Sequence, residues 1–151
     1  MSTQTSLFQQ LRAWFAGAIG RDYGLSQLQA AAGRASFLRR PPAVHFNPLG
    51  TVHGGYTATL FDAALGLAVY SAAVADECFV TASLEVTYLR PLTAGALPLR
   101  TEACVHRREG RQVTAEATLH DSQGQLCAKA RAIFMSPRSA QESAPLEHRP
   151  A

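Results

Sequence analysis

The hydrophobic positions of this 151-residue chain follow two patterns, one with a helical period and one that alternates. Residues 4–19 place large apolar side chains three or four positions apart, as in a helix that packs by one face. Residues 56–75 are apolar almost throughout, and Asp62 is the one side chain there expected to be charged at neutral pH. This run predicts a buried central helix and not a membrane span, because it contains Asp62, is rich in Ala, Thr and Ser, and precedes strand-like sequence.

Five further segments have the pattern of β-strands. Arg111 to His120 shows it most clearly, since apolar and polar residues alternate as in a strand with one buried face. Turn sequences rich in Gly, Pro and polar residues separate the segments, among them Asp121-Ser122-Gln123-Gly124. The predicted strands are residues 34–40, 79–89, 97–107, 111–120 and 125–135.

The order of these elements predicts an α+β domain in which a curved antiparallel sheet wraps around a long central helix. We assign residues 1–32 to an N-terminal helix and connector, residues 33–136 to the domain, and residues 137–151 to a disordered tail. A helix that is apolar all round needs cover on every side, and one five-stranded sheet covers only part of it. A second subunit is therefore expected to cover more.

Composition narrows the classes of function. The chain is 47% hydrophobic and carries a net charge of +3 without a dense Lys/Arg stripe, which fits a small anionic ligand better than nucleic acid. Cys78, Cys104 and Cys127 are odd in number and form no C-x-x-C motif, so we expect neither disulfides nor a zinc site. A cytoplasmic location is expected from this cysteine usage and from an N-terminus without a signal-peptide pattern.

The candidate chemistry lies just before and within the central helix. The segment Asn47-Pro48-Leu49-Gly50-Thr51-Val52-His53-Gly54-Gly55 predicts a loop that leads into a helix N-terminus. The first amides of a helix have no intrahelical partner and lie at the positive end of its dipole, so they can stabilise the oxyanion formed when a carbonyl is attacked. Gly54 and Gly55 permit a sharp turn and close approach of a ligand, although a plain glycine-rich turn has the same sequence.

The spacing of Gly55 and Asp62 bears on how such a site is built. Seven helical positions place both residues on nearly the same face, but about 10 Å apart along the axis. Both cannot contact one carbon at that separation, because reacting atoms approach to about 3 Å. A second, antiparallel helix would bring its own Asp62 beside this Gly55, which predicts an active site shared across a homodimer. In the alternative, Asp62 is a structural acid satisfied by hydroxyls such as those of Thr57, Thr59 or Ser71.

The sequence resembles the hotdog-fold acyl-CoA thioesterases, in particular the phenylacetate-pathway (PaaI-like) and mammalian thioesterase-superfamily-member-2 types. The resemblance covers roughly residues 33–135 and rests on the loop 47–55, on Asp62 nine residues after His53, on Thr81, and on Val86-Thr87-Tyr88-Leu89-Arg90-Pro91. It implies a hotdog subunit, a homodimer or a dimer of dimers (homotetramer), and hydrolysis of a thioester of coenzyme A or acyl carrier protein. No cofactor, metal, nucleic acid or membrane partner is implied.

The resemblance also implies roles for single residues. Asp62 matches the catalytic carboxylate, Gly55 the amide that polarises the thioester carbonyl, Asn47 and His53 the lining of the reacting end, and Thr81 a side chain that can hold water. Relatives of the 4-hydroxybenzoyl-CoA type can carry glutamate at the position of Asp62, so direct attack and base catalysis both stay open. Structural alternatives also stay open: turn chemistry for Asn47, a hydrogen bond within the turn for His53, and β-propensity for Thr81.

The substrate-binding candidates are Gly54 and four arginines, which would meet the phosphates of coenzyme A, although single surface arginines are usually just solvated. These arginines are Arg90, Arg107, Arg108 and Arg111. Two other functions remain open: an acyl-thioester hydratase or dehydratase of the same fold, and a non-catalytic acyl-CoA-binding module. The sequence leaves the acyl group open.

Overall fold

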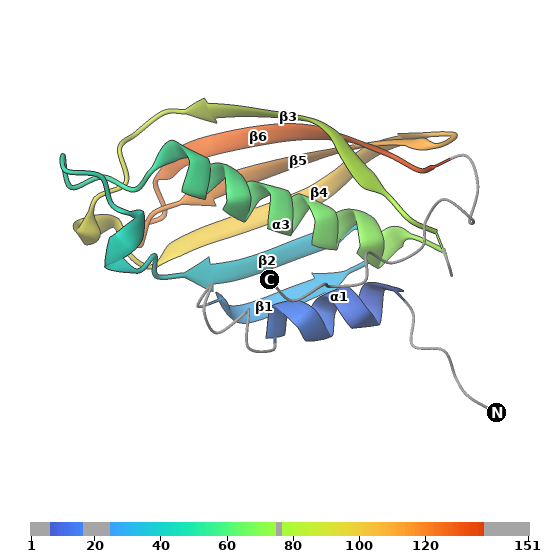
Figure 1. Cartoon of the computed structure of the whole chain (residues 1–151), viewed down its shortest axis with the longest axis horizontal. Coiled ribbons are helices and arrows are strands. Elements are labelled where there is room, and N and C mark those ends of the chain that lie inside the picture. Colours follow the sequence, from blue (N-terminus) through green and yellow to red (C-terminus); the bar gives the residue numbers. More distant parts are fainter. Residues whose placement is uncertain (1–6, 17–24, 75–76, 138–151) are drawn as a thin grey trace, which may run out of the picture.

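The computed structural model describes residues 7–16, 25–74 and 77–137, which form one antiparallel sheet with helices on one face (Figure 1). The elements in chain order are α1 (Leu7–Ala16), β1 (Leu25–Ala31), β2 (Arg34–Arg39), η1 (Ala43–His45), α3 (Gly54–Ala72), β3 (Val80–Tyr88), η2 (Ala94–Ala96), β4 (Leu99–Glu109), β5 (Gln112–His120) and β6 (Leu126–Met135). The outer parts of the predicted N-terminal helix, at 4–6 and 17–19, and the predicted tail from 138 onward lie outside the described residues.

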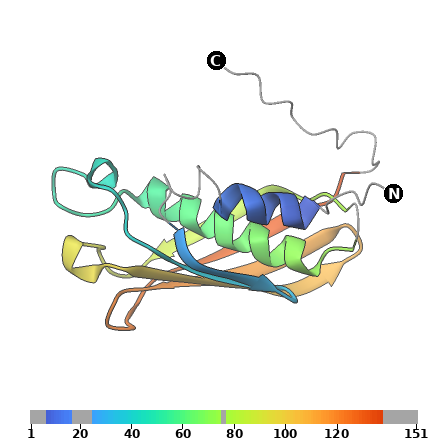
Figure 2. The same cartoon turned by 90° about the horizontal axis from the view of Figure 1, so that it is seen from below.

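The sheet has six strands in the order β1-β2-β4-β5-β6-β3, and every neighbouring pair is antiparallel. Strands β1 and β3 form its two edges. Helix α3 crosses one face of the curved sheet, and α1 lies beside α3 on that same side (Figure 2). The predicted α+β class, with a curved antiparallel sheet around a long central helix, is confirmed.

One strand was missed by the sequence analysis, which predicted five. Strand β1 lies in the segment assigned to the N-terminal connector, and its sequence LSQLQAA does not alternate. Its pairing with β2 is irregular between Ser26 and Gln29, and Gln27 has a positive φ of 52°. We attribute β1 to main-chain pairing with β2. Without β1, the outer edge of β2 would expose unpaired backbone N–H and C=O groups, and this requirement leaves no pattern in the side chains.

Helix α3 is the predicted central helix, and it begins and ends slightly earlier than predicted. Its sheet-facing side is fully buried, through Tyr56, Thr57, Leu60, Phe61, Ala64, Leu65, Leu67, Ala68 and Val69. The opposite stripe leaves Gly55, Thr59 and Asp62 exposed. Among the described residues, the sheet and α1 cover this apolar helix, and the stripe with Gly55, Thr59 and Asp62 stays uncovered. None of the described helices combines the length and apolarity that crossing a bilayer requires.

Candidate active site

The loop before α3 is closed by its own hydrogen bonds, and Asn47 makes most of them. The Asn47 Oδ1 atom accepts the N–H groups of Leu49 at 3.0 Å and Thr51 at 3.1 Å, and Nδ2 donates to Thr51 Oγ1 at 2.8 Å. Gly50 adopts a φ of 79°, which favours glycine, and its N–H donates to the Asn47 carbonyl at 2.9 Å. Asn47 thus shapes the loop, as the turn-chemistry alternative expects.

His53 fixes the start of α3 through its backbone. Its N–H donates to the His45 carbonyl at 2.9 Å, and its carbonyl accepts the Thr57 N–H at 3.1 Å. The imidazole is exposed and makes no capping hydrogen bond within the described part of the chain. The His45 ring stacks on Tyr56, in the first turn of α3, with centroids 4.0 Å apart, and buried Arg39 donates through Nε to the Tyr56 hydroxyl. These contacts hold the first turn of the helix in place.

Gly54 and Gly55 are the first two residues of α3, so their N–H groups have no acceptor within the helix. A Cβ atom on Gly55 would meet no atom of the described residues within 4 Å. A Cβ atom on Gly54 would lie 3.1 Å from the hydroxyl oxygen of Tyr88, and that hydroxyl donates to the Gly54 carbonyl at 2.6 Å. Gly54 therefore permits a close contact with β3, whereas Gly55 faces open space.

Asp62 lies on the exposed stripe of α3, and its Oδ1 atom accepts a hydrogen bond from Thr81 Oγ1 at 2.8 Å. Thr81 faces the helix because β3 is irregular between Thr81 and Ser83, which changes the face presented by the next residues. Thr81 pairs with Phe134, a buried core residue, whereas Ser83 pairs with Ile133. The edge strand thus supplies the hydroxyl that orients the carboxylate.

The hydroxyls proposed as structural partners of Asp62 point elsewhere. Each donates to a backbone carbonyl of the helix or its cap: Thr57 to His53, Thr59 to Gly55 and Ser71 to Ala68. That form of the structural alternative is wrong, since these side chains satisfy the helix backbone and not the acid.

A hollow of about 380 Å³ lies at the start of α3, between the loop and the end of β3. It contains two of the predicted substrate-binding residues, Gly54 and Arg90. The Val52 N–H donates to the Leu92 carbonyl at 2.8 Å, which ties its two walls together. Its lining is Asn47, Thr51, Val52, Gly54, Thr57, Tyr88, Leu89, Arg90, Pro91 and Leu92.

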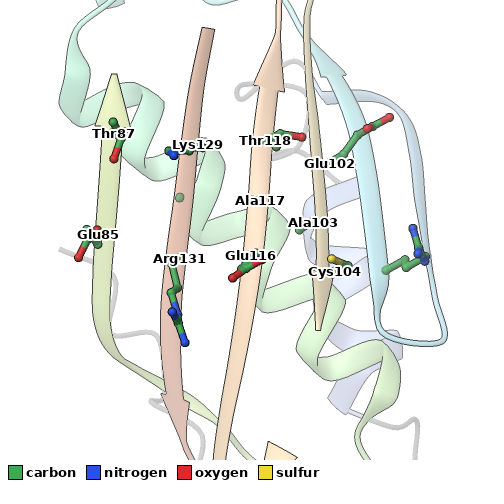
Figure 3. A pocket seen from close by; sticks show the side chains of 12 residues that line it. Glu85, Thr87, Glu102, Ala103, Cys104, Glu116, Ala117, Thr118, Lys129 and Arg131 are labelled. Atoms are coloured by element: carbon green, nitrogen blue, oxygen red, sulfur yellow. The ribbon is translucent and has the colours of Figure 1, made fainter. Parts of the chain in front are cut away.

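A larger hollow, of about 500 Å³, lies on the sheet face opposite α3 (Figure 3). Glu85, Arg131 and Glu116 are cross-strand neighbours there and alternate in charge, an ordinary arrangement for a solvent-facing sheet. Neither Gly55 nor Asp62 lines it. The smaller hollow contains neither residue itself, but it is lined by Gly54, the direct neighbour of Gly55, and therefore lies beside the helix start.

The other predicted arginines lie near the opposite end of α3. Arg108 makes a two-pronged pair with Glu77, at 2.9 Å and 2.5 Å, and this hydrogen bonding holds the pKa of Glu77 below its ordinary value. Its guanidinium lies 5.5 Å from the centre of the Phe79 ring, and the Phe79 N–H donates to the hydroxyl of Tyr70 in the last turns of α3.

The other two predicted arginines of this group also have partners within the chain. Arg107 pairs with Glu109 at 2.5 Å, and Arg111 donates to the Ser136 carbonyl at 3.1 Å. Within one chain, Arg90 is therefore the predicted phosphate contact nearest Gly54. No three His, Cys, Asp or Glu side chains among the described residues gather in a way that could hold a metal ion.

Comparison with known proteins identifies the family. The thioesterase superfamily model matches residues 49–128, more than half of the chain, and this range includes most of the loop, α3 and Thr81. No curated protein matches. Solved structures share the fold across most of their length.

Three of these structures illustrate the likeness. A variant of the phenylacetic acid degradation protein PaaI from Thermus thermophilus is 28% identical, with a TM-score of 0.69 over 79% of this chain and 98% of that chain. PaaI from the Escherichia coli phenylacetic acid degradation operon is 22% identical, with a TM-score of 0.74 over 86% and 92%. A Streptococcus mutans protein bound to acetyl-CoA is 21% identical, with a TM-score of 0.68 over 75% and 88%. With its sheet wrapped around α3 as in PaaI, the chain belongs to the thioesterase superfamily and has the hotdog fold.

Proposed function

We propose that this protein hydrolyses acyl-CoA thioesters in an active site shared between two subunits. One observation carries the proposal: α3 presents on its exposed side both an N-terminal amide, at Gly55, and an oriented carboxylate, Asp62. Membership of the thioesterase superfamily supports thioester hydrolysis as the reaction class.

Each group has a defined task in this chemistry. The Gly55 N–H donates to the thioester carbonyl oxygen, which gains negative charge as the carbonyl carbon is attacked. Asp62 either takes a proton from the attacking water or attacks the carbon itself, to give an anhydride that water then opens. In both routes a C–O bond forms, the C–S bond breaks, and the thiol leaves with a proton. Because Oδ1 of Asp62 accepts the hydrogen bond from Thr81, we assign the proton transfer or the attack to Oδ2.

The separation of the two groups motivates the second subunit. Gly55 and Asp62 of one α3 are about 10 Å apart along the helix, too far to act on one carbon. The exposed stripe of α3 and the edge strand β3, where Val80 is 58% and Tyr88 52% exposed, offer a continuous surface to a second copy. An antiparallel pair of α3 helices would set the partner's Asp62 beside this Gly55.

The hollow beside the helix start is where we propose that the thioester enters. Arg90 lines it and offers a cation to a phosphate of coenzyme A, and Gly54 forms part of its wall. The Streptococcus mutans neighbour, which is bound to acetyl-CoA, supports a coenzyme A thioester as the substrate class.

A thiol-release assay over aromatic and aliphatic acyl-CoAs tests the proposal. The wild-type protein should release coenzyme A, and Asp62→Asn should lower kcat by roughly 10²–10⁴, the span for a lost acid–base group. Glu85→Gln is the matched control, because Glu85 is an exposed acid on the opposite face of β3 and should leave kcat unchanged.

Other outcomes point to the alternatives. Near-normal kcat in a folded Asp62→Asn protein would remove Asp62 from the mechanism. Hydration of an enoyl-CoA without thiol release would identify a hydratase, and binding of acyl-CoA without any turnover would identify a binding module.

A further inference from the structure

A single hydrogen bond joins the edge strand to the peptide that carries the proposed oxyanion donor. The Tyr88 hydroxyl donates to the Gly54 carbonyl at 2.6 Å. The Gly54 carbonyl and the Gly55 N–H belong to one planar peptide unit, so a force that fixes one end of this unit fixes the direction of the other. The contact therefore bears directly on where the Gly55 N–H points.

We propose that Tyr88 is a positioning residue for thioester hydrolysis. It holds the Gly54–Gly55 peptide so that the Gly55 N–H is aimed at the substrate carbonyl oxygen. The same hydrogen bond polarises the peptide, since a carbonyl that accepts a strong hydrogen bond makes the N–H of its own amide a better donor. The inference rests on the proposed function, because it assigns Tyr88 a task only if Gly55 is the donor.

The surroundings of Tyr88 favour this role over simple packing. Within one chain the side chain is 52% exposed, so its burial against the rest of that chain contributes modestly to stability. Its ring and hydroxyl lie so close to the helix that a Cβ atom on Gly54 would sit 3.1 Å from the hydroxyl oxygen and 3.2 Å from Cζ. Any side chain at residue 54 would therefore require the Tyr88 ring to shift by a few tenths of an ångström.

The strand end that carries Tyr88 is itself held firmly. The N–H groups of Leu89 and Arg90 both donate to the Cys127 carbonyl, at 2.8 Å and 3.0 Å. The Val52 N–H, two residues before Gly54, donates to the Leu92 carbonyl at 2.8 Å. Tyr88 thus links the end of β3 to the start of α3, two segments that other hydrogen bonds already fix, and it lines the hollow proposed for the thioester.

Tyr88→Phe removes the hydroxyl and keeps the ring. Removing an oxyanion donor costs about 10²–10³ in kcat, and loosening a donor that remains should cost less, about tenfold. The Michaelis constant and the dissociation constant of free coenzyme A should stay within about twofold, because the ring and the hollow are preserved.

Tyr70→Phe is the matched control for loss of a tyrosine hydroxyl. The Tyr70 hydroxyl bonds both the carbonyl and the N–H of Phe79, each at 2.7 Å, near the other end of α3. Tyr70→Phe should lower the melting temperature more than Tyr88→Phe but leave kcat within about twofold. A purely structural role for Tyr88 would reverse this pattern, with stability lost and kcat kept.

Gly54→Ala perturbs the same contact from the helix side, because its Cβ displaces the Tyr88 ring. If both substitutions act through one hydrogen bond, kcat of the double variant should be no more than about twofold below the lower single variant. Losses that multiply would show that the two residues act independently and would overturn the proposal.

A measurement on the ligand-free protein separates this inference from the proposed function. In a ¹H–¹⁵N correlation spectrum, Tyr88→Phe should shift the Gly55 amide resonance and leave that of Gly66, further along α3, in place. An unmoved Gly55 resonance overturns the inference whatever the activity. Full kcat in Tyr88→Phe, alongside an inactive Asp62→Asn, also overturns it and leaves the proposed function standing.

Discussion

Replacing Thr81 by valine removes the hydroxyl that orients Asp62 and preserves the shape of the side chain. The hydrogen bond from Thr81 to Oδ1 is 2.8 Å long and has a carboxylate acceptor, a class that contributes about 1.5–3 kcal/mol when intact. Thr81 and Asp62 are both exposed, so water replaces part of the bond, and we take the lower end of this range. A loss of about 1.5 kcal/mol corresponds to a fall in kcat of roughly tenfold, with KM unchanged.

The same thiol-release assay measures this effect, with two matched variants. Thr81→Ser keeps the hydroxyl and should retain most of kcat. Thr87→Val makes the same chemical change on the same strand, at a position that pairs with Lys129 on the opposite sheet face, and should leave kcat unaltered. A kcat of Thr81→Val within twofold of that of Thr87→Val would refute the view that Thr81 orients the carboxylate.

Two further substitutions probe the helix start and the hollow beside it. Gly55→Ala should leave the melting temperature unchanged or higher, because its Cβ meets no described atom within 4 Å and alanine favours helix by up to about 1 kcal/mol. The value of kcat/KM should nevertheless fall, because the methyl group enters the proposed carbonyl site. A lower melting temperature would show that this site is packed. Arg90→Gln should raise KM for acyl-CoA several-fold and weaken its salt dependence, whereas Arg100→Gln, on an exposed position of β4, should do neither. Equal KM values and equal salt dependence in the two variants would remove Arg90 from phosphate binding.

The strongly patterned elements of the fold could be predicted from the sequence. Apolar and polar residues alternate along β5, and α3 is a long apolar run that begins with a glycine pair, so the local sequence predicts each element. The α+β class and the placement of Gly55 and Asp62 on one helix followed from these patterns. Strand β1 could not be predicted, because its Ala- and Gln-rich sequence forms a strand through pairing with β2.

The contacts that complete the site come from tertiary structure. Strict alternation would put Thr81 on the same face as Glu85 and Thr87, and only the irregularity after Thr81 turns its hydroxyl toward Asp62. Tyr88 belongs to the segment 86–91 on which the family resemblance rests, but its hydrogen bond to Gly54 spans 34 positions and leaves no local sequence signal. The ion pair of Arg108 with Glu77 spans 31 positions and likewise has no sequence signature.

The shared active site is the central claim, and a mixing experiment tests it most directly. One variant carries Asp62→Asn, and the other carries Gly55→Val to block the carbonyl site; each homodimer should be nearly inactive. When the two are unfolded and refolded together, about half of the dimers are mixed, and each mixed dimer has one intact site and one site with both lesions. Activity should therefore return to about a quarter of the wild-type value. A mixture that stays inactive, while native mass spectrometry shows that mixed dimers have formed, would contradict the shared site and require both groups to act within one chain.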